Sequence, residues 1–137
     1  MEVLQIKEAY KDYDHFFITF YQKGIIDELK DSKVYFLTDP RRNVFLFLKC
    51  FFETFKILMK ERPKVIISTG AGIAIPSIII GKIFLRSKVI FIESFTRIHE
   101  PSLSGRIAYY FSDLFFVQWK HLLKKYGKKA IYRGAVI

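Results

Sequence analysis

Apolar residues along this chain gather in short runs that alternate with longer apolar or amphipathic stretches. Short runs rich in Val, Ile, Leu and Phe are typical of strands buried on both faces of a parallel sheet. They predict strands at His15–Tyr21, Val34–Leu37, Val65–Ser68, Val89–Ile92, Leu114–Val117 and Ala130–Tyr132. The stretches between them predict helices at Val3–Lys11, Gly24–Lys30, Val44–Glu61, Ile73–Leu85, Ser102–Phe111 and Lys120–Tyr126. The alternation predicts one α/β domain over residues 1–137, with a Rossmann-like parallel sheet and helices on both faces.

The predicted helix at Val44–Glu61 is apolar around most of its circumference. Asn43 can cap its start, and Pro63 follows its end. Its polar side chains form one narrow stripe, made by Lys49, Glu53, Lys56 and Lys60. Two interpretations stay open: a helix buried between the sheet and a neighbour, or a helix that also meets lipid or a partner subunit. The residues expected to make such a contact are Phe45, Phe47, Phe51, Phe52, Arg41 and Arg42.

The composition indicates a folded, strongly basic protein. With 51% hydrophobic residues in 137, the chain can bury a core, which excludes a disordered segment. The net charge of +10, from 23 Lys+Arg against 13 Asp+Glu, favours an anionic partner: a membrane surface, a nucleic acid or a phosphorylated ligand. The 15 Phe exceed the needs of a small core, so some are expected at an interface with protein or lipid.

Several kinds of chemistry are excluded by the residues present. Cys50 is the only cysteine, so it can form neither an internal disulfide nor a zinc cluster, and its apolar neighbours predict a buried thiol. His15, His99 and His121 are scattered, and only His99, near Arg97, stays a candidate for chemistry. No nucleophile or metal motif is present, so no catalytic residue is assigned, and neither a metal nor a cofactor is expected.

The apolar window from Val65 to Leu85 has the length of a membrane span, but its pattern argues against one. Polar and small residues from Ser68 to Gly72 interrupt it, and so does Pro76. An irregular backbone cannot satisfy its hydrogen bonds in lipid. The window is therefore predicted to be a strand, a loop and a helix.

Two polar loops follow neighbouring strands of the predicted sheet. Parallel α/β sheets bind ligands at the carboxyl ends of their strands, where small residues and helix N-termini favour anions. A phosphate or diphosphate site is therefore predicted, with Thr69, Gly70, Ala71 and Gly72 in one loop and Glu93, Ser94, Arg97 and Ser102 in the other. Three alternatives stay open: the glycine loop as a tight packing turn, Glu93 as a loop or helix cap, and Arg97 as an ion-pair partner of Glu93 or Glu100 rather than of a phosphate.

Four segments carry a resemblance to a known family: Val-Ile-Ile-Ser-Thr-Gly-Ala-Gly at 65–72, Phe-Ile-Glu-Ser-Phe-x-Arg-Ile at 91–98, Pro-Ser-Leu-Ser-Gly-Arg at 101–106, and Asp-Leu-Phe-Phe-Val-Gln-Trp at 113–119. They resemble the membrane-associated subunit of bipartite glycosyltransferases, which serve lipid-linked oligosaccharide and exopolysaccharide synthesis. The resemblance implies the N-terminal half of a GT-B fold.

The same resemblance implies a function and its partners. The subunit would bind a polyprenyl- or dolichyl-diphosphate-sugar acceptor, peripherally, at the cytoplasmic face of a membrane. A small nucleotide-sugar-binding subunit would be its partner. Transfer of N-acetylglucosamine or a related sugar from a UDP-sugar would need both chains. The two polar loops would then line the acceptor side of the cleft between the subunits.

The chain departs from the family pattern at its start. Members open with a strand and a Gly-Gly-His loop, and neither precedes the first predicted helix here. A fragment or a shortened gene product is expected. Because the first strand would be central, its absence leaves either a gap in the sheet or a direct pairing of His15–Tyr21 with Val65–Ser68.

A rival hypothesis comes from the charge alone. The chain could be a basic anion-binding module without enzymatic activity, attached to anionic lipid or single-stranded nucleic acid through lysines and aromatic rings. However, most Phe residues fall in the core patterns of strands and helices. Nucleic acid is therefore not the expected partner.

Overall fold

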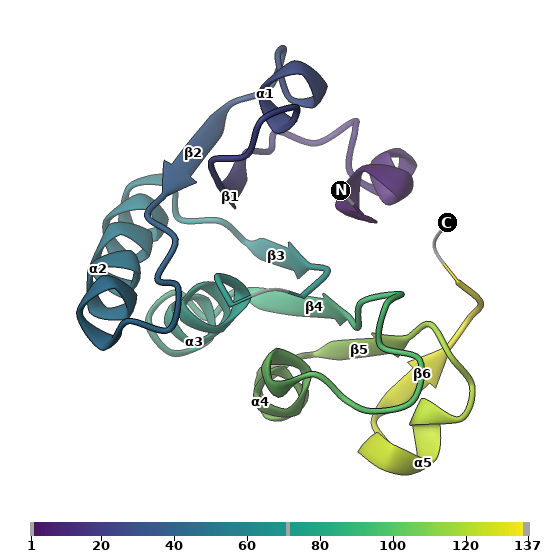
Figure 1. Cartoon of the computed structure of the whole chain (residues 1–137). Helices are drawn as coiled ribbons and strands as arrows, with labels where there is room; N and C mark the ends of the chain where they lie inside the picture. Colours follow the sequence, from purple (N-terminus) through teal and green to yellow (C-terminus); the bar gives the residue numbers. More distant parts are fainter. Residues whose placement is uncertain (1, 71, 136–137) are drawn as a thin grey trace.

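The computed structural model describes residues 2–70 and 72–135, and it has an α/β architecture with two parallel sheets (Figure 1). The smaller sheet pairs β1 (Phe17–Phe20) with β2 (Val34–Leu37). The larger sheet contains, in spatial order, β3 (Val65–Ser68), β4 (Lys88–Ile92), β5 (Leu114–Val117) and β6 (Ala130–Tyr132). Each strand pair is parallel, as predicted.

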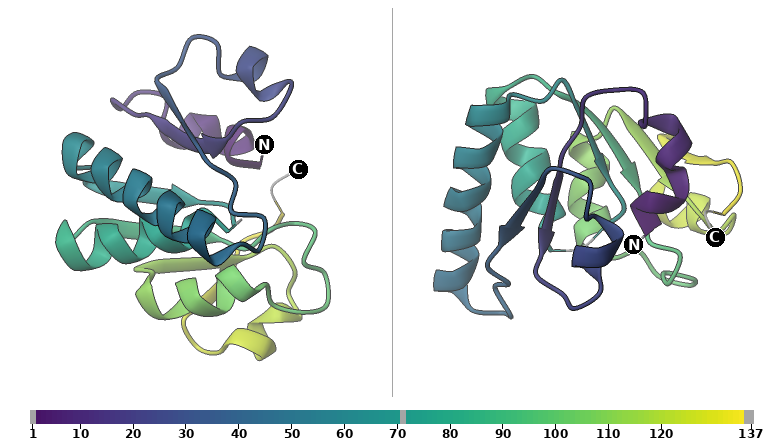
Figure 2. Two further views of the ribbon diagram at one scale, coloured as in Figure 1. Left: turned by 60° about the vertical axis from the view of Figure 1, so that its left-hand side comes forward. Right: turned by 90° about the horizontal axis from the view of Figure 1, so that it is seen from above.

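The helices lie on both sides of the strands, which confirms the Rossmann-like prediction. They are the 3₁₀ helix η1 (Glu2–Ala9), α1 (Ile25–Glu28), α2 (Val44–Glu61), α3 (Ala74–Phe84), α4 (Leu103–Phe111) and α5 (Leu122–Tyr126). Helices α2, α3 and α4 pack side by side in one layer, and η1 and α1 lie across β1 and β2 from α2 (Figure 2). The first helix differs from the prediction, because η1 is a 3₁₀ helix with a non-helical residue at Ile6.

Polar side chains cap the N-termini of two helices, and the cap at Asn43 is the predicted one. The Asn43 side chain accepts hydrogen bonds from the backbone N–H groups of Phe45 (2.9 Å) and Leu46 (3.3 Å), so it caps α2. The Ser102 hydroxyl accepts from the Gly105 N–H at 2.8 Å and caps α4. Such caps satisfy N–H groups that have no partner within the helix.

The buried apolar residues form two separate clusters. In the larger cluster, the rings of Phe91 on β4 and Phe115 on β5 stack with their centroids 5.2 Å apart. Buried residues of α3, α4 and α5 belong to the same cluster. In the smaller, Tyr10, Phe17 and Leu29 pack with apolar residues of η1 and β2. The two sheets therefore have different cores.

The strands β1 and β3 do not pair, so of the two expected outcomes, a gap or a direct pairing of His15–Tyr21 with Val65–Ser68, the structure shows the gap. Helix α2 packs beside α3 and also contacts β2, so it joins the small sheet to the rest of the molecule across this gap.

Two smaller predictions are also settled by the fold. Cys50 is 1% exposed on α2, so its thiol is buried, and burial raises its pKa. The window Val65–Leu85 divides into β3, a loop and α3, as predicted. None of the helices within residues 2–70 and 72–135 combines the length and apolar character needed to cross a bilayer.

Candidate functional site

The loops that follow β3 and β4 meet at one edge of the larger sheet. Ser68 is paired with Phe91, so the two strands end side by side. A Cβ atom placed on Gly70 would lie 3.8 Å from the Ser94 Cβ, which shows how closely the loops approach. Gly70 has a φ of 94°, a backbone conformation that residues with a Cβ atom rarely adopt. A glycine is therefore needed at this turn.

The two loops line an open depression of about 420 Å³. Its lining includes each predicted diphosphate residue that the structure describes: Thr69, Gly70, Gly72, Glu93, Ser94, Arg97 and Ser102. Ala71, also predicted, lies outside the described residues. Glu2, Thr96, Leu103 and Ser104 also line it. The structure thus brings the two predicted loops into one site.

The Glu93 carboxylate holds this region together. It is 0% exposed, and it accepts hydrogen bonds from the Ser94 N–H (3.0 Å), the Ser102 N–H (3.0 Å) and the Ser102 hydroxyl (2.8 Å). The Tyr126 hydroxyl donates to it as well. Burial, together with the Glu93 carboxylate, raises the pKa of Tyr126 far above its ordinary value. These contacts favour Glu93 as a cap that positions the loop between β4 and α4.

Gly105 makes this arrangement possible, and this packing role was not predicted from the sequence. A Cβ atom at Gly105 would collide with the Tyr126 hydroxyl and with a Glu93 carboxylate oxygen. Glycine therefore lets the first turn of α4 approach the buried carboxylate. Gly105 falls within a resemblance segment, but its spacing gives no local signal of a contact with Tyr126.

A second carboxylate at the site belongs to Glu2, near the N-terminus of the chain. Its Oε1 accepts from the Ser94 hydroxyl (2.9 Å) and the Phe95 N–H (3.0 Å). Its Oε2 accepts from the Gln118 side-chain amide at 3.1 Å. Gln118 is 2% exposed and also donates to the Glu93 carbonyl at 2.9 Å. No pattern in the sequence connects these positions.

Arg97 is exposed at the rim of the depression. The sequence left it free to pair with Glu93, with Glu100 or with a phosphate. In the structure Glu100 binds Lys125 (3.0 Å), which lowers the pKa of the Glu100 carboxyl, and Glu93 is enclosed by its own donors. The Arg97 side chain is thus placed where a ligand entering from solvent would meet it.

The Phe116–Trp119 segment packs against the second loop. The Trp119 indole N–H donates to the Phe95 carbonyl at 2.8 Å, and the two rings lie 5.1 Å apart. His121 contacts the Ile98 carbonyl, and its ring lies 5.8 Å from that of His99. These contacts place the segment at the edge of the larger core, packed against the second loop.

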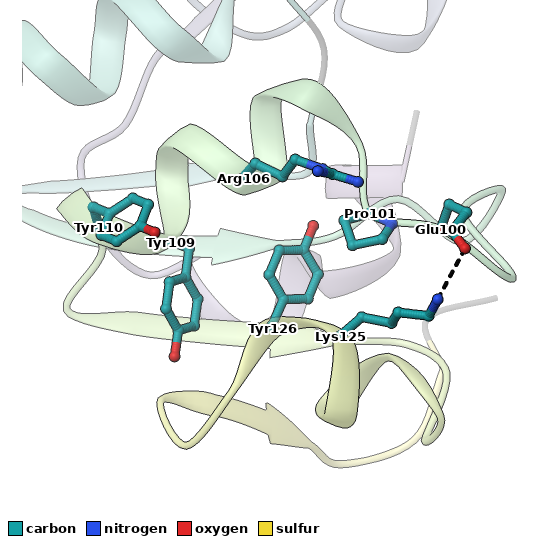
Figure 3. Close-up of a pocket in the computed structure, with 7 residues that line it drawn as sticks. All are labelled: Glu100, Pro101, Arg106, Tyr109, Tyr110, Lys125 and Tyr126. Atoms are coloured by element: carbon teal, nitrogen blue, oxygen red, sulfur yellow. Dashed lines mark hydrogen bonds and ion pairs between the residues drawn. The ribbon is translucent and has the colours of Figure 1, made fainter.

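A second, smaller depression of about 270 Å³ lies between α4 and α5 (Figure 3). It is lined by Glu100, Pro101, Arg106, Tyr109, Tyr110, Lys125 and Tyr126. The Tyr126 hydroxyl points towards α4 in this view, where it reaches Glu93, and the Lys125–Glu100 ion pair closes one side (Figure 3). Tyr126 of the smaller depression is therefore hydrogen-bonded to Glu93 of the larger one.

Helix α2 exposes part of its apolar surface. Phe45 is 82% and Phe52 63% exposed, whereas Phe47 and Phe51 are half-buried. Arg41 and Arg42, just before the helix, are also exposed. Phe45 and Phe52 are thus the aromatic residues of the expected contact face that reach solvent most fully.

Comparison with known proteins identifies relatives of one kind. The family model described as "Oligosaccharide biosynthesis protein Alg14 like" matches residues 38–136, well over half of the chain. Similar proteins named "UDP-N-acetylglucosamine transferase subunit ALG14" occur in Homo sapiens (29% identity, 69% of this chain and 45% of the relative) and Candida albicans (37%, 55% and 36%). The Schizosaccharomyces pombe protein with that name is 41% identical over 54% of this chain and 37% of its own length. The matched segment thus spans less than half of each of these relatives.

Proposed function

The chain belongs to the Alg14-like oligosaccharide biosynthesis family, and we propose that it is the acceptor-binding, membrane-docking subunit of a two-subunit glycosyltransferase. Its ligand would be a polyprenyl or dolichyl diphosphate that carries a sugar. The observation that carries this proposal is the joining of the two polar loops in one open depression at the carboxyl ends of β3 and β4. Sheets of this kind bind ligands at that edge.

The diphosphate would be held by neutral donors and one cation. Thr69, Gly70 and Gly72 border the depression on one side and Ser94 on the other; the sequence adds Ala71 to the first group. Ser102 also lines it, but its N–H and hydroxyl both donate to Glu93, so Ser102 would support the loop rather than bind the ligand directly. Arg97 supplies a positive charge at the rim, and a hydrogen bond to a charged group contributes about 1.5–3 kcal/mol. Glu93 would act as a positioning residue, because its oxygens are engaged with the chain's own donors.

Binding of a diphosphate through these contacts alone would be weak, so the lipid must add to it. The exposed Phe45 and Phe52, together with Arg41 and Arg42, would place the chain on a membrane, and the half-buried Phe47 and Phe51 would border this contact. Each basic residue near an anionic leaflet contributes about 1 kcal/mol. We infer a peripheral location at the cytoplasmic face, where nucleotide sugars are available.

The sugar donor would be held by another chain. Relatives are named as subunits of a UDP-N-acetylglucosamine transferase, which supports a partner that binds the UDP-sugar. In this proposal the present chain is one half of a GT-B enzyme, and it transfers N-acetylglucosamine or a related sugar only in the complex. The reaction would take place in the cleft between the halves.

The proposal is tested by reconstitution. The chain is combined with its candidate nucleotide-sugar-binding subunit, vesicles that contain a polyprenyl diphosphate sugar, and labelled UDP-N-acetylglucosamine. We expect transfer only with both chains, and a loss of about tenfold or more for Arg97→Ala, from one charge-assisted contact. Gly70→Val should also lose activity, because valine disfavours a φ of 94°.

Arg133→Ala is the matched control, because Arg133 is equally an exposed arginine but lies beyond β6 and outside the depression. It should retain activity. Full activity of both Arg97→Ala and Gly70→Val would contradict the assignment of the loops.

A further inference from the structure

Three hydrogen-bond donors converge on one negatively charged group in the depression. They are the Ser94 hydroxyl, the Phe95 backbone N–H and the Gln118 side-chain amide, and the group is the Glu2 carboxylate. The three distances lie between 2.9 and 3.1 Å. The donors come from the end of β4 and the end of β5, whereas the acceptor comes from η1. The chain thus carries an occupied anion site of its own.

The donors are suited to an oxyanion. All three are neutral, and both oxygens of the carboxylate are bound, in the way that two oxygens of a phosphoryl group can be bound. The Gln118 amide is fixed in advance, since it is 2% exposed and also donates to the Glu93 carbonyl. The Phe95 N–H is fixed as well, because the Trp119 indole holds the carbonyl of the same residue. The site is therefore preorganised by one buried and one partly buried hydrogen bond.

The Glu2 side chain is less firmly held than the three donors, so its carboxylate can move away from them. It lies in the first residue of η1, a 3₁₀ helix in which the described residues are not fully buried. The small cluster under η1 is formed by Tyr10, Phe17 and Leu29, and Glu2 is not one of its members. Glu2 also borders the same depression as Gly70 and Arg97. Movement of its side chain would open the donors to that depression.

We propose that Ser94, Phe95 and Gln118 form an oxyanion subsite for a phosphoryl group, and that Glu2 is an internal competitor for it. A phosphoryl group and the Glu2 carboxylate cannot share the same donors, and their charges repel each other. Binding of the ligand must therefore displace Glu2. The assignment of the ligand as a lipid diphosphate rests on the proposed function, whereas the anion site itself rests on the hydrogen bonds.

The experiment measures binding of inorganic pyrophosphate to the whole chain by calorimetry. Glu2→Gln keeps the size of the side chain but removes its charge, so pyrophosphate should bind about tenfold more tightly, as expected when a competing internal ligand is weakened. Gln118→Leu should bind about tenfold more weakly, because one donor to the anion is lost. Glu8→Gln is the matched control, since Glu8 is an exposed carboxylate on the same helix and lies outside the depression.

A measurement on the unaltered chain tests the subsite even if a variant fails to fold. Pyrophosphate should shift the amide signals of Phe95 and of the Gln118 side chain in a nitrogen–proton correlation spectrum. Equal pyrophosphate affinity for the unaltered chain and Glu2→Gln would overturn the competition. An absence of binding by every variant would overturn the subsite itself.

A parallel arm uses vesicles with and without a polyprenyl diphosphate sugar. If pyrophosphate binding follows the expected order but the lipid is not bound, the subsite stands and the acceptor proposal fails. If the lipid binds and Glu2→Gln changes neither affinity, the acceptor proposal stands and the competition fails. The two ideas can therefore be separated.

Discussion

Glu93 and Gly105 show how single residues shape the candidate site. The buried Glu93 carboxylate collects donors from Ser94, Ser102 and Tyr126, and so it ties the second loop to α4 and α5. A buried charge is tolerated only when hydrogen bonds replace its lost hydration. Gly105 leaves the space in which those bonds form. The cluster supports the loop without offering Glu93 itself to a ligand.

At the residue scale we expect Gly105→Ala to destabilise the fold strongly, although it adds only one methyl group. The added Cβ would collide with the Tyr126 hydroxyl and a Glu93 oxygen, so either α4 shifts or the buried carboxylate loses a partner. Overpacking costs about 1–3 kcal/mol, and an unsatisfied buried group costs a similar amount. Chemical denaturation would measure the loss of unfolding free energy.

Gly72→Ala is the matched control for stability. A Cβ atom at Gly72 would meet nothing within 4 Å, so we expect a change within about 0.5 kcal/mol. Equal stability of Gly105→Ala and Gly72→Ala would contradict the packing described around Glu93.

Helix α2 has two different faces. Cys50, Thr54 and Leu58 recur every four residues and are buried, whereas Phe45 and Phe52 are exposed. The Glu53 carboxylate, which the sequence places in the polar stripe, accepts from the N–H and hydroxyl of Thr38 at 3.1 Å. Hydrogen bonds thus attach one side of the helix to the loop after β2, and aromatic rings on another side are exposed to solvent.

At the element scale we expect the double variant Phe45→Ser/Phe52→Ser to lose binding to anionic vesicles. Removing two exposed aromatic side chains takes away apolar area that would enter the bilayer interface. The unfolding free energy should change little, because both rings already lie in solvent. Co-sedimentation with vesicles that contain an anionic lipid would measure the effect.

Tyr110→Ser is the control, since Tyr110 is 81% exposed but lies on α4. Unchanged vesicle binding by the double variant would refute a docking role for this face. Steeply salt-dependent binding to oligonucleotides without vesicle binding would instead favour a nucleic-acid-binding module.

The whole molecule is divided at the gap between β1 and β3. One part contains the four-stranded sheet with the larger core, and the other contains β1, β2 and the three-residue cluster of Tyr10, Phe17 and Leu29. A two-stranded sheet has little stability of its own. The hydrogen bonds of Glu2 with Ser94 and Phe95 are among the contacts that connect the two parts.

At the molecular scale we expect the two parts to differ in amide hydrogen exchange. Amides of β1, such as that of Ile18, should exchange at least about tenfold faster than those of Phe91 and Phe115, because the smaller core resists local opening less. Exchange measured by mass spectrometry or magnetic resonance would test this. Equal protection of β1 and β4 would show that the parts open together.

Local features of the amino-acid order were sufficient to predict most elements and the placement of the two loops. The bounds of β2, β3, β5 and β6 agree with the prediction, and Asn43 caps the helix that it precedes, as predicted. Strand periodicity, helix capping and the position of a loop after a strand depend on residues close together in the chain. The resemblance at residues 65–119 likewise indicated the family that the comparisons show.

The separation of the two sheets, the Glu93–Tyr126–Gly105 packing and the Glu2 contacts emerged only from the folded arrangement. Glu2 and Gln118 lie 116 positions apart, and Glu93 and Tyr126 lie 33 apart. Contacts of this kind depend on how helices and strands pack in three dimensions, and the backbone between the partners carries no local signal of them. The amino-acid order therefore indicated where an anion could bind, and the packing of distant segments determined which donors face it and which carboxylate occupies them.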